Sequence, residues 1–185
     1  MLSRNVFFCY DERMKNVAYP YMSKDGEFIY VPASDPYIRL AKSLAFLESL
    51  DAVMPNASVL VKCDAVIGFG ANGSEYHKTH ECERQKRNIP TGQGYELCEG
   101  CHPKNHSEQK AVRDAQNKGN DASGAVLYLW GHWWCCEPCW AALIGAGVKR
   151  VCLLGGSEKF FNKGNPENII GHQFDERLYQ IIHVR

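Results

Sequence analysis

Two short motifs carry the residue types that could do chemistry in this chain, His106-Ser107-Glu108 and Cys136-Glu137-Pro138-Cys139. A catalytic zinc site uses three protein ligands and keeps one coordination position open for water. The imidazole and the two thiolates suit that ligand set, and a carboxylate two residues after the histidine can act as a base beside the metal. The motifs therefore predict His106, Cys136 and Cys139 as zinc ligands and Glu108 as the catalytic residue. A closed structural zinc site, completed by a fourth protein ligand, is the alternative.

The residues around both motifs resemble the cytidine and deoxycytidylate deaminase family. His106 to Val112 is similar to the first zinc-binding helix of that family, and Tyr128 to Ile144 is similar to its strand, second zinc loop and second zinc helix. The chain departs from the family at Cys135, because a proline normally precedes the first thiolate there. The resemblance extends from about Asp35 to Leu154.

The resemblance implies a zinc-dependent hydrolytic deaminase with a three-layer α/β/α fold around a central mixed sheet. Zinc would activate a water molecule that attacks C4 of cytosine, and Glu108 would carry a proton to N3 and help ammonia leave. Asn72 would bind a sugar hydroxyl, the Ser107 backbone would face the pyrimidine edge, and Trp133 and Trp134 would line the pocket mouth. As alternatives, the Asn-Gly pair is a common turn and one of the tryptophans belongs to the core.

A second group of metal-binding residue types lies in the polar stretch 70–105. Its members are His77, His80, Cys82, Cys98, Cys101 and His102. A loop of this length with little apolar periodicity needs something to hold it. Arg87 to Cys98 resembles an insert that carries a structural zinc in some deoxycytidylate deaminases. We therefore expect a second, structural Zn²⁺ bound by Cys82, Cys98, Cys101 and His80, with His77 as the next candidate; free surface thiols are the alternative.

Strand and helix patterns alternate along the chain. A turn signal at Lys24–Glu27 before the β-type run Phe28–Val31 predicts a hairpin in an N-terminal extension, residues 1–34. Helices are predicted at 36–50, 108–116 and 138–146, and strands at 58–61, 65–69, 125–130 and 148–154. This alternation indicates an α/β fold. We expect one deaminase domain over residues 1–185, with 70–105 as an insert.

The composition limits which partners the protein can bind and indicates its cellular compartment. The formal net charge is zero, with 21 basic and 21 acidic residues, so no broad electrostatic field favours a nucleic-acid backbone. No apolar run is long enough to span a membrane, and no apolar leader opens the sequence. The nine cysteines then indicate metal binding and reduced thiols rather than disulfides. We expect a cytoplasmic homo-oligomer with a small nucleotide substrate.

The insert resemblance favours the conversion of dCMP to dUMP with release of ammonia. Four cations near the insert could bind the phosphate, namely Arg84, Lys86, Arg87 and Lys104, although each could equally be a solvated surface charge. A cytidine or deoxycytidine deaminase, a tRNA adenosine deaminase and a guanine deaminase are the alternative enzymes. A non-catalytic, zinc-stabilised binding module is the alternative of a different class, and Glu108 argues against it.

Overall fold

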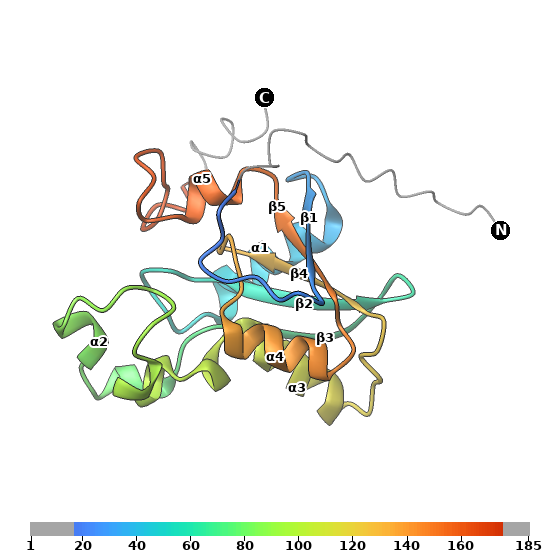
Figure 1. Ribbon diagram of the computed structural model, residues 1–185, viewed down its shortest axis with the longest axis horizontal. Helices are drawn as coiled ribbons and strands as arrows, with labels where there is room; N and C mark the ends of the chain where they lie inside the picture. Colours follow the sequence, from blue (N-terminus) through green and yellow to red (C-terminus); the bar gives the residue numbers. More distant parts are fainter. Residues whose placement is uncertain (1–16, 176–185) are drawn as a thin grey trace.

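A five-stranded mixed sheet forms the centre of the protein in the computed structural model, which describes residues 17–175 (Figure 1). The strand order is β1-β5-β4-β2-β3. The strands are β1 (Glu27–Val31), β2 (Ala57–Lys62), β3 (Ala65–Ala71), β4 (Val126–Trp130) and β5 (Arg150–Leu154). β1 and β4 run parallel to β5, whereas β2 runs antiparallel to β4 and to β3.

Helices cover both faces of this sheet. α1 (Pro36–Glu48) packs against one face, and α3 (Ser107–Asn117) and α4 (Glu137–Gly145) lie together on the other (Figure 1). α1 begins where the sequence predicts, because the Asp35 side chain accepts hydrogen bonds from the backbone amides of Tyr37 and Ile38. A short helix, α5 (Ser157–Phe161), follows β5. The predicted three-layer arrangement with a mixed sheet is confirmed.

The central strands are buried on both faces, with side chains alternating between the two helical layers. On β4, Tyr128 faces α1, where its ring centroid lies 4.9 Å from that of Tyr37. Leu127 and Leu129 point to the opposite face and are fully buried. Each such leucine contributes about 1.5–3 kcal/mol of burial free energy. The core that supports the α3–α4 layer is therefore apolar and continuous.

The stretch between β3 and α3 forms a separate lobe of short helices, at the lower left of Figure 1. They are η2 (Glu75–Lys78), α2 (Glu83–Lys86), η3 (Tyr95–Leu97), η4 (Glu99–Cys101) and η5 (Pro103–Asn105). The buried residues between Ser74 and Asn105 are Cys82, Cys98, Gly100 and Pro103. Since two of these four are cysteines and none has a large apolar side chain, hydrophobic burial alone does not explain how this insert is held.

The N-terminal part differs from the prediction. β1 forms where a strand was predicted, but it pairs in parallel with β5 at the edge of the sheet, and among residues 17–34 there is no second strand. The predicted hairpin is therefore absent from the described part of this segment, and residues 1–16 lie outside it. Within residues 17–175, no helix combines the length and the apolar character that crossing a bilayer requires.

Candidate functional site

Two helix N-termini on the same face of the sheet bring the predicted zinc ligands together. His106 is the N-cap residue of α3, Cys136 is the N-cap residue of α4, and Cys139 lies in the first turn of α4. The two helix starts are joined directly, because Gln109 Nε2 donates a hydrogen bond to the Pro138 carbonyl at 3.1 Å. Residues thirty positions apart in sequence thus meet at one point.

The three ligand atoms have the spacing of a metal site. His106 Nδ1 lies 3.5 Å from Cys136 Sγ and 3.4 Å from Cys139 Sγ, and all three atoms are within 4.8 Å of one another. One imidazole nitrogen and two thiolates form a donor set that zinc prefers. Among residues 17–175, no fourth His, Cys, Asp or Glu joins this group. Three protein ligands favour a catalytic site with an open position over a closed structural one.

The local electrostatics prepare the thiols for a cation. A hydrogen bond from Cys139, together with one from His106, lowers the pKa of Cys136 to about 5. The same hydrogen bond with Cys136, together with burial, raises the pKa of Cys139 well above its usual value, so the pair shares one proton. Burial lowers the pKa of His106, but its hydrogen bond with Cys136 and the charge of Glu108 outweigh this and raise it. A bound divalent cation would displace these protons.

Glu108 stands beside the ligands without belonging to their group. Its side chain is 6% exposed and lines a cavity in front of the metal ligands. Glu108 Oε2 lies 3.2 Å from the hydroxyl of Ser107, which is itself 2.7 Å from Asn56 Oδ1 and 2.9 Å from the hydroxyl of Ser58. A hydroxyl has one proton to donate, so Ser107 donates to Asn56 or to Glu108 while Ser58 supplies a second donor. This buried polar network fixes the start of α3 and the carboxylate on it.

Two glycines in β3 allow α3 to lie close to the sheet. A Cβ atom on Gly68 would lie 2.5 Å from the carbonyl oxygen of Ala111, and one on Gly70 would lie 2.8 Å from that of Ser107. No side chain fits in this space, because real Cβ atoms do not approach backbone atoms so closely. The glycines of β3 therefore set the depth at which α3 presents Glu108.

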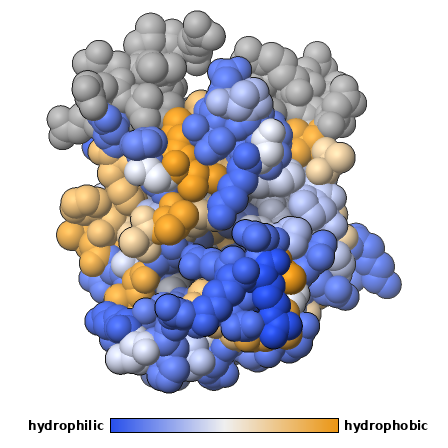
Figure 2. All heavy atoms as spheres, turned by 90° about the vertical axis from the view of Figure 1, so that its left-hand side faces the viewer, coloured by the Kyte–Doolittle hydropathy of each residue, from blue (hydrophilic) through white to orange (hydrophobic). Residues whose placement is uncertain are grey.

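A cavity of about 880 Å³ opens in front of Glu108 and the metal ligands. A volume of roughly 300–1,000 Å³ is typical of small-molecule sites. Its walls come from the loop before β2, the insert, the start of α3, the loop between β4 and α4, and Lys163. The face that Figure 2 shows is largely hydrophilic in its lower part, while apolar side chains gather on its left half. The cavity can hold a polar ligand of nucleotide size.

Asn72 lines this cavity but is already engaged. Its Oδ1 accepts hydrogen bonds from the Ser49 hydroxyl at 2.6 Å and from the Asn56 amide at 2.9 Å, and its Nδ2 donates to the Met54 carbonyl at 3.0 Å. In this structure the Asn72 side chain holds the loop before β2 against the end of β3. Contact with a sugar hydroxyl would add to this role.

The two tryptophans are placed differently. Trp134 lines the cavity, whereas Trp133 packs against Tyr19, with ring centroids 6.1 Å apart. The backbone of Ser107 begins α3, and its side chain is fully buried beneath Glu108. The structure therefore brings Trp134, but not Trp133, to the cavity wall.

Two cavity residues were not anticipated from the sequence. Tyr95 packs edge-on against His106, with ring centroids 4.9 Å apart, and burial raises the pKa of its hydroxyl. His132 is half-buried on the cavity wall, and burial followed by the charge of His106 lowers its pKa to about 4. A histidine between a strand and a Cys-x-x-Cys motif was the available signal for His132. For Tyr95 the only signal in the sequence was its position three residues before Cys98.

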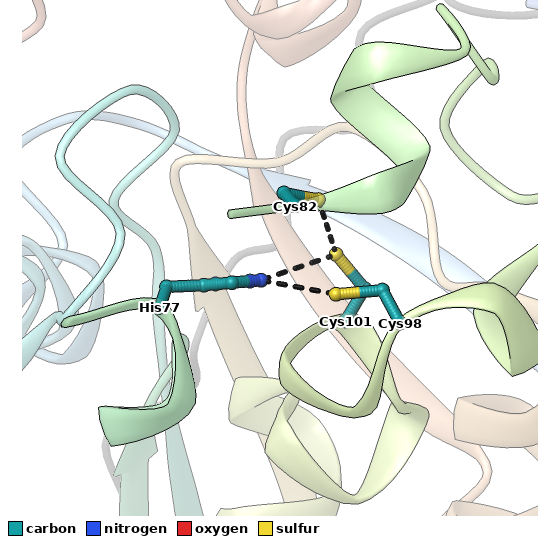
Figure 3. Close-up of side chains that lie close together, drawn as sticks. All are labelled: His77, Cys82, Cys98 and Cys101. Atoms are coloured by element: carbon teal, nitrogen blue, oxygen red, sulfur yellow. Dashed lines mark hydrogen bonds between the residues drawn. The ribbon is translucent and has the colours of Figure 1, made fainter. Parts of the chain in front are cut away.

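Figure 3 shows the second cluster, in which His77, Cys82, Cys98 and Cys101 point toward a common centre. His77 Nε2 lies 3.2 Å from Cys98 Sγ and 3.9 Å from Cys101 Sγ, and Cys82 Sγ lies 3.4 Å from Cys101 Sγ. All four ligand atoms are within 4.8 Å of one another. One nitrogen and three sulfurs are a ligand set that could hold a metal ion, and four protein ligands are typical of a closed structural zinc site.

His80, the fourth ligand preferred from the sequence, lies outside this cluster, and His77 takes its place. The His80 ring stacks on Tyr76 at 4.1 Å, and its Nδ1 faces the Thr79 hydroxyl at 2.9 Å. His77 reaches the thiols from η2. Its ring lies against Gly100, where the Cβ of any other residue would collide with the imidazole. The preference for His80 is corrected to His77.

The four cations expected to bind phosphate all have partners inside the insert. Arg84 donates to the carbonyls of Pro90 and Gln93, both at 2.9 Å. The remaining three form ion pairs, Lys86 with Glu81, Arg87 with Glu83 and Lys104 with Glu99. Their first role in this structure is to hold the insert together.

Comparisons with solved structures give several similar chains. A dCMP deaminase from the cyanophage S-TIM5 is 20% identical, with a TM-score of 0.44 over 65% of this chain and 82% of the other. A guanine deaminase from Bacillus subtilis is 22% identical, with a TM-score of 0.41 over 65% and 62%. RibD from Acinetobacter baumannii is 26% identical, with a TM-score of 0.36 over 63% and 26%.

The family comparison covers most of the chain. A search of curated protein sequences found no match. The profile of the cytidine and deoxycytidylate deaminase zinc-binding region matches residues 34–154. This span includes both metal clusters, Glu108 and all the residues that line the cavity except Lys163. The chain therefore belongs to the cytidine and deoxycytidylate deaminase zinc-binding family.

Proposed function

We propose that this protein hydrolyses the exocyclic amino group of a cytosine nucleotide, converting dCMP to dUMP and ammonia. The observation that carries the proposal is the pairing of a three-ligand metal group with a separate, buried carboxylate, Glu108, on the wall of a nucleotide-sized cavity. A binding module has no need of that carboxylate. Residues 34–154 match a deaminase family. The resemblance of the insert, residues 70–105, to the insert of some deoxycytidylate deaminases favours dCMP among the cytosine compounds.

The chemistry divides between the metal and Glu108. Zinc held by His106, Cys136 and Cys139 would supply Lewis-acid activation of a water molecule at neutral pH. Glu108 would accept a proton from the water and deliver it to N3 of the ring, and it would then take the second proton from the hydroxyl now on C4 and give it to the departing amino group. A C4–O bond forms, the C4–N bond breaks and ammonia leaves. Ser107 assists by holding the carboxylate through its hydroxyl.

The substrate contacts follow from the cavity walls. We assign the face of the base to Trp134 and the sugar to the region of Asn72, since both residues line the cavity. The Ser107 backbone, at the start of α3, is proposed to face the pyrimidine edge. Trp133 supports this wall from behind through its contact with Trp134, with ring centroids 6.2 Å apart.

A second zinc ion is part of this proposal. The cluster of His77, Cys82, Cys98 and Cys101 would bind it and so clamp the insert that forms one cavity wall. The cysteines in the described part of the chain are all free thiols, which suits a reducing cytoplasm. Metal analysis of the purified protein should give two zinc ions per chain, and a single ion would contradict the second site.

A substrate panel tests the proposed reaction. Ammonia release from the zinc-loaded protein would be measured with dCMP, CMP, dCTP, deoxycytidine, cytidine, adenosine and guanine side by side. We expect the highest kcat/KM with dCMP. Equal efficiency on deoxycytidine would favour the nucleoside reaction. A preference for guanine or adenosine would show that the substrate base is not cytosine. Binding without turnover would indicate a binding module.

A further inference from the structure

Lys163 is a cavity residue to which the site described above gives no role. It follows α5 and reaches the wall of the cavity from outside the insert. The other lysines and arginines on this wall are engaged: Lys78 pairs with Glu75 at 2.7 Å, Lys86 pairs with Glu81, and Arg84 binds backbone carbonyls. Among the described residues, Lys163 has no acidic partner. Its ammonium group is therefore free for an anionic ligand.

His132 places Lys163 relative to the metal ligands. Its Nδ1 accepts a hydrogen bond from the Trp134 amide at 3.4 Å, so its proton sits on Nε2. His106, His132 and Lys163 all line the same cavity. Burial, and after it the charges of His106 and Lys163, lower the pKa of His132 to about 4. The cavity wall thus carries an exposed ammonium group as well as the metal ligands and His132.

The segment after α5 and the insert lie on the same side of the molecule, at the upper and lower left of Figure 1. The cavity that both help to line has a volume of about 880 Å³, which is enough for a nucleotide. With the base held at Glu108, the far end of a nucleotide points away from the metal ligands. Lys163, the charged wall residue that has no internal partner in the described chain, would then lie near the phosphate of the substrate.

We propose that Lys163 binds the phosphate of the nucleotide substrate and thereby selects the monophosphate over the nucleoside. This inference rests on the proposed function and deepens it. An ammonium group and a phosphate form a charge-assisted hydrogen bond, about twice as strong as a neutral one. Lys163 lies outside residues 34–154, so this selectivity comes from the chain's own segment after α5 and not from the part that the family profile matches.

The test compares substrates that differ only in the phosphate. The zinc-loaded full-length protein would be assayed with dCMP and deoxycytidine as wild type, Lys163→Gln and Lys163→Arg. We expect Lys163→Gln to lower kcat/KM for dCMP by about 10-fold to 100-fold and to leave deoxycytidine unchanged. Lys163→Arg should retain most of the dCMP activity. Lys159→Gln is the matched control, since Lys159 lies on α5, pairs with Glu167 and is not a cavity residue.

Two other outcomes would overturn the inference while leaving the proposed reaction intact. One is a dCMP efficiency that Lys163→Gln does not change. The other is an equal loss with dCMP and deoxycytidine, because a phosphate contact cannot affect the nucleoside. Calorimetric binding of dUMP against deoxyuridine keeps the test independent of turnover. If the wild type fails to deaminate cytosine compounds, the proposed reaction fails, and a loss of dUMP binding in Lys163→Gln alone still supports the phosphate site.

Discussion

Glu108 shows how one residue depends on partners that are distant in sequence. Its carboxylate is buried, yet it faces three groups that carry protons or accept cations, His106, Cys136 and Ser107. A buried carboxylate in such a position is expensive unless it has a function or a full set of partners. The Ser107 hydroxyl lies 3.2 Å from the carboxylate but only 2.7 Å from Asn56 Oδ1, so Asn56 competes for its proton. The arrangement leaves Glu108 available to exchange protons.

Replacing Glu108 with glutamine should abolish turnover and preserve the fold and the metal. The amide keeps the size of the side chain but cannot accept and return a proton, and such steps contribute roughly 10²–10⁴-fold. Deamination rate, zinc content and circular dichroism would be measured together. Glu137→Gln is the control, because Glu137 is an exposed acid in the first turn of α4. Near-normal turnover by a zinc-loaded Glu108→Gln protein would refute its role.

At this scale, short spacings in the sequence predict which side chains lie close together. The His-x-Glu and Cys-x-x-Cys spacings determine how each side chain leaves its helix start, so His106, Glu108, Cys136 and Cys139 meet as expected. Asn72 and Trp133 are harder, because their roles depend on which loop packs over them. The network from Asn72 through Asn56 to Ser107 joins three segments that no local pattern connects.

Among the elements, those with local start signals were predicted well. Asp35 and Pro36 define the start of α1 within the sequence itself, and the turn at 63–64 joins two strands that pair with each other. For β1 the predicted partner was wrong. The sequence suggested a neighbouring hairpin strand, but β1 pairs with β5, with Glu27 opposite Arg150. A turn signal next to a strand favours a hairpin locally. The parallel pairing is decided by the three-dimensional order of strands, which a local signal does not contain.

The insert provides a prediction about an element held by a metal. His77→Ala should lose the second zinc ion and loosen the insert, because the short helices bury few apolar side chains of their own. His80→Ala is the matched control three residues away, and it should keep both ions. Zinc content and hydrogen exchange of residues 74–105 would be compared for the two variants. Loss of the ion in His80→Ala but not in His77→Ala would contradict the assignment of His77.

For the whole molecule, the two sides of the sheet differ in what they leave exposed. The cavity and the insert gather polar and charged residues, whereas the outer side of α1 and the loop after it expose several large apolar side chains: Leu40, Phe46, Leu47, Leu50 and Val53. Phe46 and Leu47 are 66% and 70% exposed. Apolar groups gathered in this way on a soluble surface often mark an interaction site. The loop that carries Leu50 and Val53 also forms part of the cavity wall.

We therefore expect copies of this chain to associate through the outer side of α1. Burying each of these side chains would contribute about 1.5–3 kcal/mol, so introducing two charges there should dissociate the assembly. Light scattering should give an oligomer for the wild type and a monomer for Phe46→Glu/Leu47→Glu. Val66→Glu is the control, since Val66 is an exposed apolar residue on β3 rather than on α1. A monomeric wild type, or an oligomer that survives the double substitution, would show that this face is not the interface. Because Leu50 and Val53 reach the cavity, the dissociated variant should also bind nucleotide more weakly than the Val66→Glu protein, which links assembly to the site.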